Sequence, residues 1–303
     1  MTNDIGTAIA GAVRNTADDF AACRVRRFQF GEVACEVRLP TGTDGFGPGW
    51  ELFESDGQPA FVANVIAEPA VGPIAESGVN ALIPPGDEKP TRSFWTNGAG
   101  YIVGRRVVAQ YDPTEHRIDI LVPGPEHVSA AAVAVRFALA VELAEQGGFF
   151  LHCAGLVDKG AAYLFFGPSD SGKSTMAELA DADAVLSDEA VIVKKNGSDW
   201  TAYGTPFSGM LEVGENTAAP LAAFVKLTKA DAGEPMDCVR MTGRRATQEL
   251  LRSVIALDDG PDAKARAAAN ALEAAADVPV YDFTFFPVPE AWPLVLSHLD
   301  REF

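Results

Sequence analysis

One short segment constrains this chain more than any other: residues 167–174 (GPSDSGKS) fill the phosphate-loop pattern G-x-x-x-x-G-K-[ST]. Residues 161–166 (AAYLFF) before it form an apolar run typical of a buried strand, and residues 174–180 (STMAELA) after it favour a helix. A Gly-rich turn between a strand and a helix points backbone N–H groups at an anion, and the helix dipole adds positive potential. The segment therefore predicts a site for a nucleoside triphosphate.

Side chains of this segment complete the predicted site. We expect Lys173 to reach the β- and γ-phosphates, and the Ser174 hydroxyl to bind the Mg²⁺ that bridges them. Asp170 stands where many such loops have glycine; aspartate tolerates a left-handed backbone, so the turn can form, but its charge needs compensation by Mg²⁺ or an arginine. The predicted nucleotide-binding residues are Gly167, Pro168, Ser169, Asp170, Ser171, Gly172, Lys173, Ser174 and Thr175.

A pair of acids forms a second signature. Residues 183–187 predict a short strand that ends in Asp188 and Glu189, after which residues 190–193 (AVIV) resume a strand. Open α/β sheets bind ligands at the carboxyl ends of their strands, beside which the phosphate loop also lies. We expect one carboxylate to bind Mg²⁺ and the other to accept a proton from an attacking hydroxyl, and the sequence leaves open which acid does which. The alternative is a solvated turn, because acids are usually exposed.

A histidine lies in the apolar run of residues 149–157 (FFLHCAGLV), which predicts a strand. A lone histidine in such a strand is more often a hydrogen-bonded core residue than a catalyst. The functional alternative for His152 is acid–base assistance or binding of the transferring phosphoryl group.

Composition narrows the class of protein. The chain has 303 residues, of which 48% are hydrophobic and 22% charged, as in soluble globular proteins. Its 42 acids against 24 bases give a formal charge of −18, which disfavours nucleic acid as a partner. No run approaches the roughly 18 apolar residues of a membrane span, and residues 1–15 lack the basic and apolar blocks of a secretory signal. We therefore expect a cytoplasmic protein that binds no membrane. The four cysteines are scattered, which predicts reduced thiols and no zinc site.

Strand and helix signals divide the chain. A β-rich part, residues 1–128, shows strand signals at 25–39 (broken at Gly31), 60–67, 93–96, 101–111 and 117–122, with loops at 42–49 and 69–90. An α/β part, residues 129–303, opens with the strongest helix, residues 129–146, with Ser129 as N-cap and Gly147 as part of the stop. Helices at 261–277 and 290–299 flank a strand at 278–285. We expect an α/β fold in two domains, with one continuous unit as the alternative.

The runs LHCAGLVDKGAAYLFFGPSDSGKST and LSDEAVIV resemble the C-terminal kinase domain of HPr kinase/phosphorylase and the HPr-kinase-related proteins, over residues 152–193. That resemblance implies a phosphate-loop kinase fold shared with phosphoenolpyruvate carboxykinase, and use of ATP and Mg²⁺. It makes His152 the family's histidine, Lys173 its phosphate-loop lysine, Ser174 its magnesium-binding hydroxyl, and Asp188 and Glu189 its acidic pair.

Departures from the family shape the expected activity. The HPr enzymes have aspartate at both acidic positions, the second acting as base, whereas this chain has Glu189. Only a fragment, residues 211–214 (LEVG), matches the family's dephosphorylation signature, so phosphorylase activity is not expected. The resemblance implies a kinase that transfers the γ-phosphate to a Ser or Thr hydroxyl of a peptide or protein. HPr is a doubtful substrate, and an oligomer stays open because the full HPr enzymes form hexamers.

Three alternatives remain from the sequence. A nucleotide sensor without turnover would account for Asp170 and Glu189, and a small-molecule kinase would use the same loop. Residues 228–231 (TKAD) resemble the guanine-reading [NT]-K-x-D element of GTPases. The D-x-x-G element of a GTPase is not matched: in residues 188–191 (DEAV), Val191 stands where glycine is required. A GTPase is therefore the weakest alternative.

Overall fold

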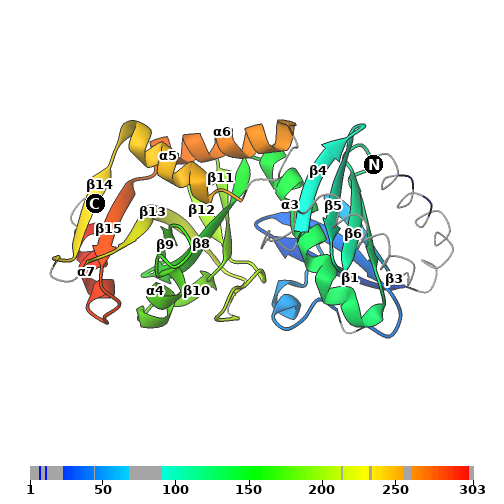
Figure 1. Ribbon diagram of the computed structural model, residues 1–303, viewed down its shortest axis with the longest axis horizontal. Coiled ribbons are helices and arrows are strands. Elements are labelled where there is room, and N and C mark those ends of the chain that lie inside the picture. Colours follow the sequence, from blue (N-terminus) through cyan, green and yellow to red (C-terminus); the bar gives the residue numbers. More distant parts are fainter. Residues whose placement is uncertain are drawn as a thin grey trace. The chain divides into compact units, whose positions relative to one another are not determined.

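Two β-sheets organise the chain, one in each of two units (Figure 1). Unit 1 comprises Met1–Glu142 and Leu257–Lys264, and unit 2 comprises Leu143–Ala256 and Ala265–Phe303. This computed structural model describes residues 7, 11, 23–43, 45–67, 91–212, 214–231, 234–255 and 261–299. The chain is therefore a mixed α/β protein, and the domain boundary expected after residue 128 stays a prediction.

Unit 1 is built on a seven-stranded mixed sheet in the order β1-β2-β3-β7-β6-β5-β4. The β2–β3 and β3–β7 pairs are parallel and the other pairs are antiparallel. The strands are β1 (Arg24–Phe30), β2 (Val33–Leu39), β3 (Phe61–Ala67), β4 (Thr91–Thr96), β5 (Ala99–Gly104), β6 (Val107–Asp112) and β7 (Arg117–Val122).

Most strand predictions for this part are confirmed, and one needs correction. The break at Gly31 is a two-residue hairpin turn in which Gly31 and Glu32 both have positive φ, as a type I′ turn requires. The single strand signal at 101–111 is in fact the β5–β6 hairpin, whose turn is Arg105 and Arg106. Two arginines carry none of the usual Gly or Asn turn signals, so apolar residues on both sides masked the turn. The loop predicted at 69–90 lies outside the described residues.

Aromatic side chains fill the core beside β1. Phe28 and Phe30 stack on each other and meet Trp50 edge-on, with ring centroids 5.2 and 5.5 Å from the indole. Trp50 opens the short 3-10 helix η2 (Trp50–Phe53), and Phe46 lies 4.4 Å from its ring centroid. Each such ring buries a large apolar area, so this cluster stabilises the core of unit 1.

The helix predicted at 129–146 begins earlier than expected. A 3-10 helix, η3 (Pro125–Ala131), leads directly into α3 (Ala132–Glu145), so Ser129 is not an N-cap. Proline favours the first helical position, which explains the earlier start. The end is as predicted, with Gly147 left-handed just after it. By length and composition alone Pro125–Glu145 could cross a membrane, but 61% of its apolar window is buried, as in core helices of soluble proteins.

Unit 2 contains an eight-stranded sheet with the path β10-β8-β11-β12-β13-β15-β14, and β9 pairs with both β8 and β13. Its strands are β8 (Gly148–Asp158), β9 (Ala161–Phe166), β10 (Ala184–Ser187), β11 (Ala190–Asn196), β12 (Asp199–Tyr203), β13 (Ala218–Lys229), β14 (Asp237–Met241) and β15 (Val280–Phe285). Its helices are α4 (Lys173–Leu179), α5 (Gly243–Ser253), α6 (Pro261–Asp277, which begins in unit 1) and α7 (Ala291–Leu299).

Both faces of this sheet are covered by helices, with α5 and α6 on one face and α4 and α7 on the other (Figure 1). Strand β9 shows why its run is apolar throughout: Leu164 and Phe166 pack toward α5 and α6, while Tyr163 and Phe165 pack toward α4 and α7. A strand buried on both faces has no polar alternation, so it reads as a continuous apolar run. The strand predicted from residues 161–166 is confirmed.

Candidate functional site

Three strands that run in the same direction bring the predicted site residues together. Strand β13 is parallel to β9, and β10 runs the same way because both β9 and β10 are antiparallel to β8. Their carboxyl ends therefore share one edge of the sheet, where ligands bind in α/β folds. The phosphate-loop segment follows β9, the acid pair follows β10, and Lys229 ends β13.

The loop between β9 and α4 contains three residues with positive φ. Gly167 and Gly172 have φ values of 156° and 101°, and Asp170 is left-handed at 62°. The Ser171 N–H donates to the Pro168 carbonyl at 3.2 Å, which closes the turn. Gly172 is required by space as well, because a Cβ there would lie 2.7 Å from the Phe285 ring. The first amides of α4 have no partner within the helix, so they are available to a bound anion.

Lys173 is the best-defined cation of the loop. It is 8% exposed, and its ammonium donates to the carbonyls of Gly167 at 3.1 Å and Pro168 at 3.0 Å. Desolvation by burial lowers the pKa of Lys173, and the nearby charge of Glu189 partly opposes that effect. The ammonium therefore bonds to the loop itself, and it must exchange those carbonyls for phosphate oxygens if a nucleotide binds.

Asp188 is buried and held by backbone amides. It is 2% exposed, and its two carboxylate oxygens accept N–H groups of Gly209 at 2.6 Å and Leu211 at 2.9 Å. Gly209 has to be glycine for this approach, since a Cβ there would lie 3.0 Å from the Asp188 Oδ2. Residues 209–211 are thus hydrogen-bonded directly to the Asp188 carboxylate. Asp188 is therefore buried, unlike an acid in a solvated turn.

Glu189, in the turn just before β11, lies beside His152 of β8. The Glu189 side chain is 39% exposed, and its Oε1 lies 3.4 Å from the His152 Nδ1. The same nitrogen donates to the Glu189 backbone carbonyl at 2.9 Å. Because a carbonyl only accepts, Nδ1 carries the proton, and Nε2 is the acceptor of the neutral ring. His152 is therefore hydrogen-bonded, as a core histidine would be, and it also borders the site.

One cavity of about 430 Å³ brings these groups together. Three lining residues were not among the predicted site residues: Gly209, Met210 and Lys229. Lys229 belongs to the TKAD segment weighed as a GTPase element, but the preceding Thr228 hydroxyl donates to Asp282 at 2.8 Å. Every residue of the cavity comes from unit 2, and the full lining is His152, Ser169, Asp170, Gly172, Lys173, Ser174, Thr175, Asp188, Glu189, Gly209, Met210 and Lys229.

The donor set fits a magnesium nucleotide. Ser171 is 6% exposed, and its hydroxyl has no hydrogen-bond partner among the described residues. Within the same described part of the chain, no group of three or more His, Cys, Asp or Glu could hold a metal ion by itself. Magnesium usually takes one or two protein ligands and completes its shell with phosphate oxygens and water. Ser174, Asp188 and Glu189 are the residues at this edge that could serve.

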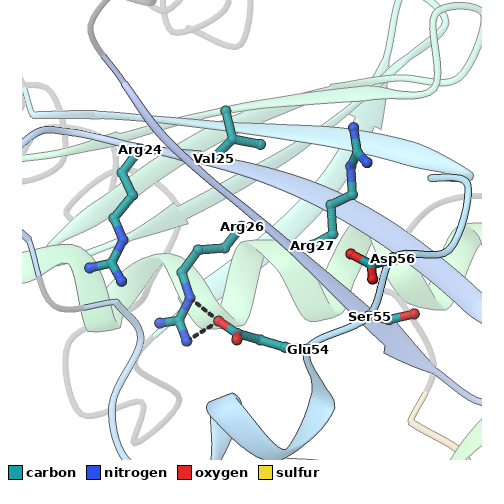
Figure 2. A pocket seen from close by; sticks show the side chains of 7 residues that line it. All are labelled: Arg24, Val25, Arg26, Arg27, Glu54, Ser55 and Asp56. Carbon is teal, nitrogen blue, oxygen red and sulfur yellow. Dashed lines mark hydrogen bonds and ion pairs between the residues drawn. The ribbon is translucent and has the colours of Figure 1, made fainter.

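A second hollow, of about 570 Å³, lies on β1 in unit 1 (Figure 2). Two of its three arginines bond to acids: Arg26 pairs with Glu54 (Figure 2), and Arg27 donates two hydrogen bonds to Glu36. Arginines already bound to carboxylates have little attraction left for an anionic ligand. None of the predicted site residues lines this hollow, whereas the cavity of unit 2 is lined mostly by them, so the cavity of unit 2 is the better candidate.

The comparisons with known proteins are sparse. No protein-family model matches the chain, and no curated protein matches it. Among solved structures, the HPr(Ser) kinase/phosphatase from Coxiella burnetii is similar over 50% of this chain and 88% of its own, with 14% sequence identity and a TM-score of 0.31. A similarity at that level carries no argument about fold or function, so membership of the HPr-kinase-related proteins stays a prediction.

Proposed function

We propose that this protein is a phosphate-loop kinase that uses ATP and Mg²⁺ to phosphorylate a Ser or Thr hydroxyl of a peptide or protein. The observation that carries the proposal is the shared cavity: Lys173, Ser174, Asp188, Glu189 and His152 all line it. A lysine, a hydroxyl and two acids around one space are the groups that phosphoryl transfer requires, since its catalysis is mainly positioning and charge neutralisation.

The residues divide the work by their surroundings. Lys173 and the loop amides bind and orient the phosphates, and bound Mg²⁺ supplies the charge that offsets them. Asp188 is immobilised by two amides, which suits a residue that holds a ligand in a fixed place. Glu189 is more exposed and lies against His152, which suits a base that must reach an incoming hydroxyl. We therefore assign metal binding to Asp188 and proton acceptance to Glu189.

A second candidate function is nucleotide binding without turnover. It is favoured by the hydrogen bonds of the Lys173 ammonium to two loop carbonyls and by the left-handed Asp170, whose carboxylate lies in the phosphate loop. A small-molecule kinase would use the same groups with a low-mass acceptor.

Radiolabelled ATP distinguishes these functions. Label in a peptide or protein supports the proposed kinase, label in the low-mass fraction supports a small-molecule kinase, and tight ATP binding without transfer supports the sensor. Lys173→Ala should abolish both binding and transfer without unfolding the protein, whereas Lys264→Ala, an exposed lysine on α6, should change neither. Transfer retained in Lys173→Ala would contradict the mechanism.

A further inference from the structure

Ser187, the last residue of β10, is completely buried although its side chain is polar. Its hydroxyl donates to the Phe207 carbonyl at 2.9 Å and accepts the N–H groups of Glu189 and Ala190, both at 3.1 Å. A serine hydroxyl has one donor and two acceptor sites, so Ser187 uses its full capacity. The turn that contains Asp188 and Glu189 is therefore held by hydrogen bonds to this one buried side chain.

The hydrogen bonds of Ser187 extend to His152 through a single peptide plane. The Glu189 carbonyl and the Ala190 N–H belong to the same peptide group, which is planar. Ser187 accepts from the N–H side of that plane, while the carbonyl side accepts from the His152 Nδ1 at 2.9 Å and from the Cys153 N–H at 3.2 Å. The carbonyl of this plane is the nearer acceptor of the His152 Nδ1, and the Glu189 Oε1, 3.4 Å from the same nitrogen, is the other.

Ser187 also reaches the segment that holds the other acid. Its hydroxyl donates to the carbonyl of Phe207, the first residue of the segment 207–211. The backbone N–H groups of Gly209 and Leu211 in the same segment donate to the Asp188 carboxylate. One buried hydroxyl is thus bonded to both sides of the site: to the backbone of Glu189 and to the segment that fixes Asp188.

We propose that Ser187 is a positioning residue, whose hydroxyl sets the backbone of Glu189 and the Nδ1–H tautomer of His152 and aligns both acids with the phosphate loop. Its effect on turnover rests on the proposed kinase function, whereas its effect on the tautomer does not. Such residues touch neither nucleotide nor acceptor, and they act through the groups that do.

The test compares Ser187→Ala with Ser55→Ala. Ser55, in unit 1, is a matched control. Its hydroxyl donates to the Gln29 side chain at 3.0 Å and accepts the N–H of Gly57, two residues later, at 3.1 Å. Ser187 likewise accepts the N–H of Glu189, two residues later. We expect Ser187→Ala to lower kcat about 10- to 100-fold, the usual effect of losing such a partner, with a much smaller change in KM for ATP. Ser55→Ala should leave both unchanged, and Ser187→Thr, which keeps the hydroxyl, should recover part of kcat.

The histidine provides a readout that needs no activity. Imidazole ¹⁵N shifts of nucleotide-free wild type should report the Nδ1–H tautomer of His152, and Ser187→Ala should shift it toward a mixture of both tautomers. A lower melting temperature with unchanged kcat and ¹⁵N shifts would make Ser187 merely structural and overturn the proposal. If wild type neither binds nor uses ATP, the proposed function fails. The positioning role is then still tested by the ¹⁵N shifts: unchanged shifts in Ser187→Ala overturn it, and changed shifts support it.

Discussion

Replacing Asp188 with asparagine separates the structural role of this acid from its proposed metal-binding role. The carboxylate accepts two backbone N–H groups, at 2.6 and 2.9 Å, while buried to 2% exposure. Asparagine has one carbonyl oxygen, so one amide loses its acceptor and the other bonds to a neutral group. A hydrogen bond to a charged group contributes about 2 kcal/mol, and a neutral one about half of that, which gives a loss of about 3 kcal/mol.

Removal of a buried charge offsets part of that loss. Eliminating the desolvation cost of the carboxylate returns about 1 kcal/mol, so the net fall in the free energy of unfolding of Asp188→Asn is about 2 kcal/mol. Urea denaturation followed by circular dichroism measures it. Glu189→Gln is the matched control: its side chain is 39% exposed, and it should unfold within about 0.5 kcal/mol of wild type.

The comparison has a clear outcome that would refute the reasoning. If Asp188→Asn unfolds at the same urea concentration as Glu189→Gln and wild type, the two amide hydrogen bonds do not hold residues 209–211 on the acid. Both variants should lose phosphoryl transfer, since one acid is assigned to the metal and the other to the proton. A stability difference without an activity difference is therefore the expected pattern for this pair.

Three further results are expected. Because desolvation by burial lowers the pKa of Lys173 below its ordinary value of 10.5, the unfolded chain binds more protons than the folded chain at pH values just below 10.5. Wild type should therefore gain stability relative to Lys173→Met as the pH rises toward 10.5, and a constant difference in urea midpoint contradicts this. Gly172→Ala should destabilise by about 1–3 kcal/mol more than Gly160→Ala, since both have positive φ but only Gly172 faces the Phe285 ring; equal melting temperatures contradict it. ATP should raise the melting temperature far more with Mg²⁺ than with EDTA, and equal shifts would argue against a metal in the site.

Local patterns predicted the centre of unit 2 well. The strand at residues 161–166 could be predicted because it is buried on both faces and is therefore apolar throughout. The turn after it could be predicted from the glycines that follow directly in the sequence. The acids Asp188 and Glu189 could be placed because strand ends at one sheet edge share a location. The 3-10 helix η3 that precedes α3 and the β5–β6 turn were missed because a proline start and an arginine turn compete with stronger apolar signals around them.

Residues joined by tertiary contacts could not be predicted in this way. Ser187 bonds to Phe207, 20 residues away, and Asp188 bonds to Gly209, 21 residues away. A serine at a strand end has no sequence signal that distinguishes a buried anchor from a solvated turn residue. Lys229 joins the cavity only through the parallel pairing of β13 with β9. Phe207 and Gly209 lie in the irregular segment between β12 and β13, and no local pattern specifies which strand end such a segment contacts.

The charges around the cavity explain why a divalent cation and the nucleotide should bind together. Asp170, Asp188 and Glu189 line it against Lys173 and Lys229, so the lining has an excess of negative charge when His152 is neutral. A triphosphate adds further negative charge, and two lysines cannot balance it at short range. Under the proposed function, the same acids that oppose a free nucleotide would attract Mg²⁺, whose charge would offset that of the triphosphate. The proposal therefore predicts that the magnesium complex binds more tightly than the free triphosphate, and that metal and nucleotide binding depend on each other.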